Sequence, residues 1–394
     1  MGTRAGSGVS LNEVATVAAR EAVMAALERL GDAKASYGFV FASPRHDLSS
    51  VLAGAREAAA GVEIIACTTA GEISEGGLVH GGVSALLVAS DSSTAKAAFA
   101  ERLRSDPLAA ATALLTARAV ARDGAPPSAK RHATTVLFTD GLSGTGERLV
   151  GELNDRAQGS SQIVGGAAGD EGKFKVTHVG AGAQAAGDAV AALHVFGAAP
   201  WGVGVNHGLR STSKQMRVTA AEGNVIYELD GQPAFSLYQR HARARGVELT
   251  RENASQYLIG NELGIHFFDT IARARAPLAV GADGSLSCAA AIPKGSMVSI
   301  LDGDPMSMVD AARSAAKEAR DNLGGREPAA VLLFDCICRG MILKDGFQRE
   351  IDAVRSVFGD VPLAGFLTYG EIARYQGKLD GWHNATAVVV AIPN

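Results

Sequence analysis

The sequence predicts an α/β (α+β) fold in which mixed β-sheets are covered by helices. It is built from repeated β-α-β-β units with a strand-rich insertion. Three observations lead to this prediction. The order strand, helix, strand, glycine turn, long loop, strand occurs three times along the chain. The pattern T-x-G-E-I occurs twice, at 69–73 and at 368–372. A stretch with antiparallel strand and turn patterns, 217–310, separates the second unit from the third.

The first unit begins with the apolar run "YGFVFAS" (37–43), which predicts a buried strand. "DLSSVLAGAREAAAG" (47–61) predicts a helix, because Asp47 or Ser49 can cap its start. "EIIACTTAGEI" (63–73) predicts a strand that runs into a glycine turn, and "GVSALLVAS" (82–90) predicts the strand that closes the unit.

The second and third units repeat this order with different residues. In each unit the first strand is followed by a helix, and the second strand ends at a glycine turn. We align the turns as Ala70-Gly71-Glu72, Ala168-Gly169-Asp170 and Tyr369-Gly370-Glu371. The predicted segments are 134–144, 146–159, 162–171 and 188–197 in the second unit, and 329–340, 345–359, 362–372 and 384–392 in the third.

Outside the units, residues 1–10 are small and polar, which predicts disorder. Residues 11–31 predict an amphipathic helix that ends at Gly31 and either covers a sheet or serves a dimer.

The composition excludes several classes of function. The chain has 394 residues, a net charge of −4 and no long basic block, so nucleic acid is not expected as a main partner. Four cysteines without a CxxC pair and no predicted signal peptide favour free thiols in the cytoplasm. No apolar run reaches transmembrane length, so no membrane insertion is expected. The nine histidines form no HxxxH pattern, so no metal site is predicted.

The glycine turns are the first candidate for a binding site. Ligands bind at the carboxyl ends of the strands in open α/β sheets, and glycine lets a ligand approach the backbone. The acidic residue after each glycine would repel a phosphate and attract an ammonium group or a hydrogen-bond donor. The alternative is that Glu72 and Glu371 only cap backbone N–H groups of their own turns.

"FDCICRG" (334–340) is the second candidate. If it is a strand, Cys336 and Cys338 share one face, and Arg339 at its end could hold a carboxylate in a bidentate way. A guanidinium near a carboxylate turn would suit a zwitterion such as an amino acid. A structural ion pair for Arg339 and core packing for the thiols are the alternatives.

These motifs together resemble the FIST sensory proteins, which combine a FIST N-terminal and a FIST C-terminal domain. The resemblance rests on "EIIACTTAGEI", "IVGGAAGDE", "RVTAAEGNVIYELDGQPAFSLY", "LLFDCICRG" and "GFLTYGEI…HNATAVVV", which span about 36–392. It implies a tail and helix at 1–33, a FIST N-terminal domain at 34–228 and a FIST C-terminal domain at 229–394.

The resemblance also implies a cytoplasmic signal-input protein without a resident cofactor, which binds a small ligand such as an amino acid and signals through a separate partner. That partner could be a histidine kinase, and a homodimer is possible. The predicted ligand-binding residues are Thr69, Gly71, Glu72, Gly166, Asp170, Arg339, Thr368, Tyr369, Gly370, Glu371, His383 and Asn384.

Two alternatives stay open at this point. Some members of the family look like haem-binding nitric-oxide sensors that act on a histidine kinase. Haem needs an axial ligand in an apolar site, for which His383, His241 and Tyr369 are eligible. The other alternative is an enzyme that uses the clustered carboxylates, although no nucleophile or metal pattern accompanies them.

Overall fold

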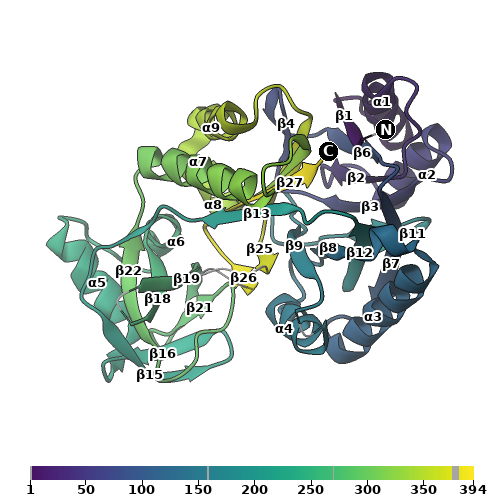
Figure 1. The fold of residues 1–394 in the computed structure, drawn as a ribbon. Coiled ribbons are helices and arrows are strands. Elements are labelled where there is room, and N and C mark those ends of the chain that lie inside the picture. Colours follow the sequence, from purple (N-terminus) through teal and green to yellow (C-terminus); the bar gives the residue numbers. More distant parts are fainter. Residues whose placement is uncertain (1, 158, 269, 375–380) are drawn as a thin grey trace.

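The structure is a computed structural model that describes residues 2–157, 159–268, 270–374 and 381–394. It confirms an α/β protein with mixed sheets covered by helices. Three six-stranded sheets surround a common centre, and an inserted domain with a fourth sheet lies beside the third repeat (Figure 1). The repeated unit is therefore real, and it is longer than the sequence predicted, because a strand and a helix precede each β-α-β core.

The first repeat runs from the N-terminus to residue 89. Its elements are β1 (Arg4–Ser10), α1 (Ala15–Leu30), β2 (Tyr37–Ala42), α2 (Leu48–Ala58), β3 (Glu63–Thr68), β4 (Glu72–Ser74), β5 (Gly77–Val79) and β6 (Val83–Ala89). The second repeat has the same order. Its elements are β7 (Ser93–Glu101), α3 (Pro107–Gly124), β8 (His132–Thr139), α4 (Gly146–Ala157), β9 (Gln162–Ala167), β10 (Val179–Ala181), β11 (Gln184–Ala186) and β12 (Ala189–Gly197).

The third repeat is interrupted by the inserted domain, 207–304, which follows its first strand. The repeat consists of β13 (Gly202–Asn206), α7 (Pro305–Asn322), β23 (Pro328–Cys336), α8 (Ile337–Leu343), α9 (Gln348–Phe358), β24 (Leu363–Thr368), β25 (Glu371–Arg374), β26 (Gly381–His383) and β27 (Ala387–Pro393).

The inserted domain is strand-rich and antiparallel, as the sequence predicted, but it begins and ends earlier than 217–310. Its elements are β14 (Arg210–Ser211), β15 (Met216–Glu222), β16 (Val225–Leu229), β17 (Gln232–Pro233), α5 (Ala234–Ala244), α6 (Ala254–Ile259), β18 (Glu262–Phe267), β19 (Thr270–Arg275), β20 (Pro277–Val280), β21 (Leu286–Cys288) and β22 (Met297–Asp302).

The hairpins that follow the glycine turns are exchanged between repeats in a closed ring. Hairpin β4–β5 of the first repeat pairs with β24 of the third. Hairpin β25–β26 of the third pairs with β9 of the second, and hairpin β10–β11 of the second pairs with β3 of the first. The sheet orders are β1-β6-β2-β3-β10-β11, β7-β12-β8-β9-β25-β26 and β13-β27-β23-β24-β4-β5. Each sheet is thus completed by another repeat.

The prediction of disorder for residues 1–10 is wrong, because β1 occupies most of this segment. It pairs antiparallel with β6 from Arg4 to Ser10. The small residues serve close packing against α1. A Cβ atom added at Gly6 would lie 2.0 Å from the carbonyl oxygen of Ala26, and one at Gly8 would lie 2.2 Å from that of Ala22. The low side-chain volume that suggested disorder is what lets the helix lie on the strand.

The third repeat also differs from the prediction at "FDCICRG". The strand β23 ends at Cys336, and residues 337–343 form the helix α8. Cys336 and Cys338 therefore do not share a face of one strand, and Arg339 lies on a helix. A helix N-terminus directly after a strand has no periodicity of its own in such a short segment, which is why the pattern was misleading.

The centre of the three sheets is an aromatic cluster. Phe41, Phe138 and Phe334 occupy equivalent positions on β2, β8 and β23, opposite Cys67, Gly166 and Phe366 on the neighbouring parallel strands. The ring centroids of Phe41 and Phe138 are 5.6 Å apart, and those of Phe138 and Phe334 are 6.1 Å apart. One large side chain from each repeat therefore fills the common core.

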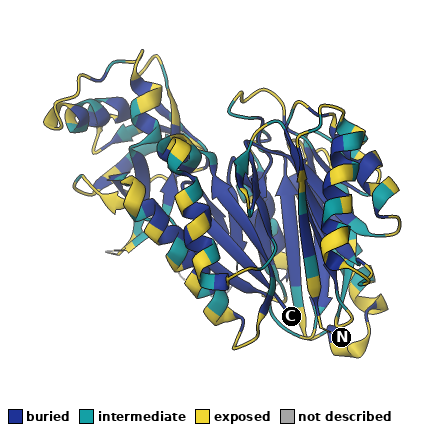
Figure 2. Cartoon of the chain, turned by 90° about the horizontal axis from the view of Figure 1, so that it is seen from above, coloured by how far each residue is buried: buried dark blue, intermediate teal, exposed yellow. Residues whose placement is uncertain are grey.

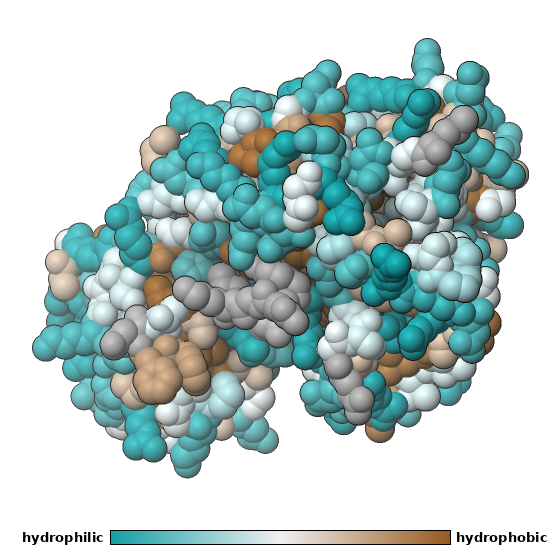
Figure 3. All heavy atoms as spheres, viewed as in Figure 1, coloured by the Kyte–Doolittle hydropathy of each residue, from teal (hydrophilic) through white to brown (hydrophobic). Residues whose placement is uncertain are grey.

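Burial follows the layers of the fold. The central strands of the three six-stranded sheets are buried along most of their length, whereas the helices expose their outer faces (Figure 2). The face of the molecule shown in Figure 3 is mainly hydrophilic, with small separate apolar areas.

We predict that Phe138→Ala lowers the free energy of unfolding by about 3–5 kcal/mol, because it opens a cavity in the aromatic cluster. Urea denaturation of the variant and the parent protein measures this difference. Phe267→Ala is the matched control, since Phe267 is 70% exposed and its loss should change stability by less than about 0.5 kcal/mol. Equal effects of the two substitutions would contradict the central role of Phe138.

Candidate functional site

The three glycine turns meet at one place. In each repeat, a backbone N–H of the turn donates to a carbonyl oxygen at the end of the second strand of another repeat. These bonds are Ala70 N to Leu367 O at 2.9 Å, Gly169 N to Thr68 O at 3.0 Å and Tyr369 N to Ala167 O at 3.1 Å. The turns that the sequence placed far apart therefore form one ring of backbone contacts.

The glutamates of the first and third turns are held in the same way. The hydroxyl of Thr69 donates to Glu72, and the N–H of Gly82 donates to Glu72 Oε2 at 3.1 Å. The hydroxyl of Thr368 donates to Glu371 Oε1 at 2.5 Å. The bond to Glu371 Oε2 in the third turn comes from the N–H of Thr386, at 3.1 Å. These two carboxyls thus cap the loops that carry the chain to β6 and β27.

Both glutamates are fully buried, and burial has the largest effect on their pKa values. Burial raises the pKa of Glu72 to about 8, although the bonds from Thr69 and Gly82 favour the ionised form. Burial likewise raises the pKa of Glu371 well above its ordinary value. Contact of Glu72 or Glu371 with a ligand stays a prediction.

The glycines of these turns make room for the exchanged hairpins. A Cβ atom added at Gly71, where φ is +155°, would lie 2.9 Å from the ring of His80. One added at Gly370 would lie 2.3 Å from the ring of Trp382. Gly166 lies within β9, where an added Cβ atom would be 2.6 Å from Thr368 Cγ2. All three positions are therefore filled by protein side chains.

The second turn does not align with the others as the sequence suggested. Backbone N–H groups donate to the carbonyls of Gly71, His178 and Gly370 at equivalent places, so His178 corresponds to the two glycines. Residues 170–177 are an extension of the second turn, and Val179 stands where Glu72 and Glu371 stand in the other hairpins. The signal for this extension is the longer spacing between the turn and the hairpin.

Asp170 organises this extension. It accepts hydrogen bonds from the N–H groups of Phe174, Lys175 and Val176 at 2.7, 2.6 and 3.0 Å, and from the hydroxyl of Tyr369. Burial alone would raise the pKa of Asp170, but these donors hold it below its ordinary value. The structure thus brings Asp170 and Tyr369 together, and they form a hydrogen bond with each other.

Arg339 is enclosed by the protein. Its Nε lies 3.0 Å from Glu350 Oε1 and 2.9 Å from Asp335 Oδ1, and all three side chains are fully buried. The contact with Asp335 is an ion pair whose hydrogen-bond geometry is poor, since neither Asp335 oxygen receives a well-aligned bond from a described residue. These contacts correspond to the structural ion pair that the sequence indicated as the alternative to ligand binding by Arg339.

His383 and Asn384 are buried at the end of the third hairpin. Burial lowers the pKa of His383 to about 3, so its imidazole is neutral at ordinary pH. Neither His383 nor the other two haem candidates lines either of the cavities described below. His241 shares hydrogen bonds with Tyr257 and Thr212, and Tyr369 is bonded to Asp170. These residues do not fit a haem site as they stand.

A cavity of about 500 Å³ opens beside the ring of turns. All three repeats contribute to it, through Ala70, Glu171 and Leu367. The remaining lining residues come from the first hairpin and from the region of α8. They are Gly76, Gly77, Leu78, His80, Ile337, Gly340, Met341, Lys344, Asp345, Phe347 and Gln348. The sequence predicted the neighbourhood of this site but none of these residues.

Two oppositely charged residues of the cavity have unusual backbone conformations. Glu171 has φ +55° and Lys344 has φ +47°, a region that residues other than glycine seldom adopt. Glu171 accepts hydrogen bonds from the hydroxyl of Ser43 at 2.6 Å and from Lys173 Nζ at 3.0 Å. Glu171 follows the predicted Asp170 directly, but no sequence signal marked Lys344.

One residue that lines the cavity, Leu78, is smaller than its counterpart in the third hairpin. Leu78 lies opposite Ile73 in the first hairpin, and Trp382 lies opposite Ile372 in the third. The Trp382 ring packs so closely on the second repeat that a Cβ atom added at Gly146 would be 2.3 Å away. In the first hairpin the smaller Leu78 leaves the corresponding space open.

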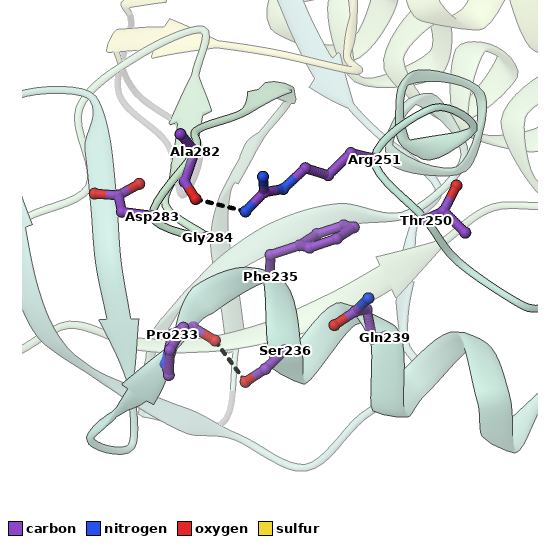
Figure 4. Close-up of a pocket in the computed structure, with 9 residues that line it drawn as sticks. All are labelled: Pro233, Phe235, Ser236, Gln239, Thr250, Arg251, Ala282, Asp283 and Gly284. Atoms are coloured by element: carbon purple, nitrogen blue, oxygen red, sulfur yellow. Dashed lines mark hydrogen bonds between the residues drawn. The ribbon is translucent and has the colours of Figure 1, made fainter.

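A second cavity, of about 400 Å³, lies in the inserted domain between α5 and the turn at 282–284 (Figure 4). Arg251 donates to the carbonyl of Ala282 and Ser236 to that of Pro233, so both polar side chains bond to the backbone around them. Asp283 accepts from Ser285. These groups stabilise the local turns, and the cavity beside the glycine turns is the better candidate.

Glu262 is a buried carboxyl between the inserted domain and the third repeat. It lies on β18, and neither of its oxygens has a hydrogen bond of good geometry to a described residue. Burial and the neighbouring Glu371 together raise its pKa from 4.5 to about 8, although Cys338 and Arg339 act to lower it. The folded protein therefore keeps the Glu262 carboxyl protonated up to a pH of about 8.

Comparisons with known proteins match most of this chain. The family model of the FIST N domain matches residues 36–232, and that of the FIST C domain matches residues 234–374. Two uncharacterized proteins of Mycobacterium tuberculosis, from strains CDC 1551 / Oshkosh and H37Rv, are each 29% identical over 193 residues. The match covers 46% of this chain and 47% of each relative, so the chain spans about half the length of these curated relatives.

Among the described residues, no helix is long and apolar enough to cross a membrane. No group of three or more His, Cys, Asp or Glu side chains within the described ranges could hold a metal ion.

We predict that Thr368→Val destabilises the protein by about 1–3 kcal/mol, because Glu371 loses a buried donor. Urea denaturation measures the change. Thr94→Val is the matched control, since the Thr94 hydroxyl is buried without a partner among the described residues, and it should be close to neutral. A neutral Thr368→Val would show that the bond to Glu371 does not hold the turn.

We predict that Glu262 makes a contribution to stability that is lost as pH rises from about 4.5 to about 8, because the unfolded chain releases the Glu262 proton before the folded chain does. Glu262→Gln removes this contribution, so it should raise the melting temperature more at pH 8 than at pH 5. Thermal unfolding at both pH values measures the effect, with the exposed Glu248→Gln as control. The same gain at both pH values would contradict a raised pKa.

Proposed function

Because this chain belongs to the FIST family of sensory domains, we propose that it is a sensory protein that binds an amino acid or a similar small metabolite in the cavity beside the glycine turns. The observation that carries this proposal is that all three repeats line one cavity at the place where their turns meet. A ligand there contacts every repeat at once, and its binding energy can act on their relative positions.

The charges of the cavity favour a zwitterion. Glu171 offers a carboxylate to an ammonium group, and Lys344 offers an ammonium to a carboxylate. Lys344 is exposed, and its Nζ has no partner among the described residues, so it is available to a ligand. Leu78, Ile337 and Met341 supply apolar surface between the charged groups, which suits the side chain of an apolar amino acid.

The backbone at the two charged residues supports a binding role. A residue other than glycine in a left-handed conformation costs on the order of 1–3 kcal/mol, and such positions gather at binding sites. Eight non-glycine residues of the described ranges have a positive φ, and two of them, Glu171 and Lys344, line this cavity. In this proposal the strain keeps their side chains at the rim before the ligand arrives.

In this proposal the predicted turn residues shape the site and do not act as its main contacts. Thr69, Glu72, Thr368 and Glu371 hold the turns, and the bond between Asp170 and Tyr369 holds the extension that carries Glu171. The bound molecule is held and released without chemical change. The signal then passes to a separate protein, for which a histidine kinase is our candidate.

We predict that at least one of the twenty common amino acids raises the melting temperature of the protein. At a free concentration one hundred times Kd, the gain corresponds to about 2.7 kcal/mol. Leu78→Trp should abolish the shift, because it copies the way Trp382 fills the corresponding space in the third hairpin. Val120→Trp, at a position 70% exposed, is the matched control and should keep the shift.

Lys344→Met and Glu171→Gln should each weaken binding about tenfold or more, which corresponds to about 1.4 kcal/mol. Isothermal titration measures Kd, and Lys34→Met, at an exposed position, serves as the control for loss of a surface charge. Two results would contradict the proposal. One is the absence of any shift with all twenty amino acids, and the other is an unchanged shift in the Leu78→Trp protein.

A further inference from the structure

Helix α8 has two functional faces. Ile337, Gly340, Met341 and Lys344 follow one another at helical spacing and line the cavity. Cys338 and Arg339 are buried on the rest of the helix surface. The short helix therefore separates the proposed ligand from a different set of contacts.

Arg339 holds both ends of the inserted domain. Its Nη1 donates to the carbonyl of His207 at 2.9 Å, directly after β13, where the inserted domain begins. Its Nη2 donates to the carbonyl of Met308 at 2.9 Å, in the first turn of α7, where the chain returns from the inserted domain. One guanidinium thus fixes the two points at which the inserted domain joins the third repeat.

Cys338 is next to the inserted domain itself. Its thiol is near enough to the buried carboxyl of Glu262 on β18 to lower the pKa of that carboxyl, although neither Glu262 oxygen has a hydrogen bond of good geometry to a described residue. A change in the position of α8 would therefore alter three contacts of the inserted domain at the same time. They lie at His207, where the domain begins, at Met308, where the chain returns from it, and at Glu262 in its sheet.

The helix has features of an element that can move. It has seven residues, and isolated helices of this length are unstable without tertiary contacts. Gly340 lies in its middle, where glycine weakens a helix, and it packs so closely on Leu367 that an added Cβ atom would be 2.7 Å from Leu367 Cδ1. The helix ends at Lys344 with its left-handed backbone. A ligand on the cavity face meets a segment with little stability of its own.

We propose that α8 couples occupation of the cavity to the placement of the inserted domain, 207–304, which then presents the signal to the partner. This inference rests on the proposed function. A ligand packed against Ile337, Met341 and Lys344 shifts the population of α8 positions, and Arg339 and Cys338 carry the shift to the inserted domain. The coupling needs no contact between the ligand and the inserted domain.

Hydrogen–deuterium exchange of the full chain tests the coupling. It is measured with and without the amino acid that gives the largest melting-temperature shift, and on the Leu78→Trp protein without ligand, whose indole fills the same space. We expect exchange at least threefold slower in α8 and also in 207–211, 262–267 and 305–309. Residues 4–30, on the far side of the first repeat, should not change.

A decoupling variant separates transmission from binding. Cys338→Ala leaves the cavity lining intact, so it should keep the melting-temperature shift and lose the slower exchange of 262–267. The Arg339→Lys protein should lose the slower exchange at 207–211 and 305–309. If this variant does not fold, the test rests on Cys338→Ala alone.

The outcomes distinguish the two proposals. A melting-temperature shift with exchange changes confined to α8 and the other cavity-lining segments overturns the coupling and leaves the proposed function standing. No shift with any amino acid overturns the proposed function, and the Leu78→Trp protein then decides the coupling. Unchanged exchange of the inserted domain in the Leu78→Trp protein would overturn the coupling.

Discussion

The structure depends on the closed exchange of hairpins among three repeats. Taken alone, each repeat would leave its second strand at the edge of its sheet, with unpaired backbone N–H and C=O groups. Burying such groups without partners is unfavourable. The hairpin of another repeat pairs with that edge, and the third exchange closes the ring. Because every sheet is completed by another repeat, the three glycine turns must meet, and the three phenylalanines of the central cluster must pack together.

This constraint explains why the turn carries glycine followed by glutamate in two repeats. The exchanged hairpin crosses the turn so closely that a Cβ atom would clash with it, which selects glycine. The same crossing buries a loop whose N–H group needs an acceptor, and the glutamate supplies it. Burial raises the pKa of both carboxyls although the bonds that they accept favour the ionised form, and a carboxyl with a raised pKa attracts a cation less strongly.

Departures from the threefold pattern create the candidate site. The second turn is extended by 170–177, and this extension brings Glu171 to the cavity. The first hairpin carries Leu78 where the third carries Trp382, so a space that is filled in one place is open in another. The third repeat is opened by the inserted domain, and its two ends are fixed by Arg339. Burying an ion pair is costly in desolvation, and its best-supported benefit is a single defined arrangement.

The sequence by itself determined the repeated unit, the glycine turns with their glutamates and the strand-rich insertion. These are local signals, since apolar periodicity and turn residues act within a few positions of each other. The sequence did not reveal β1, because small residues that fit under a helix look like those of a disordered tail. Only the tertiary structure decided which repeat each hairpin completes, that Arg339 is enclosed, and that Glu171 and Lys344 share a cavity. Those outcomes depend on pairing between segments up to about three hundred residues apart, and their energy comes from surfaces that meet only when all three repeats are in place.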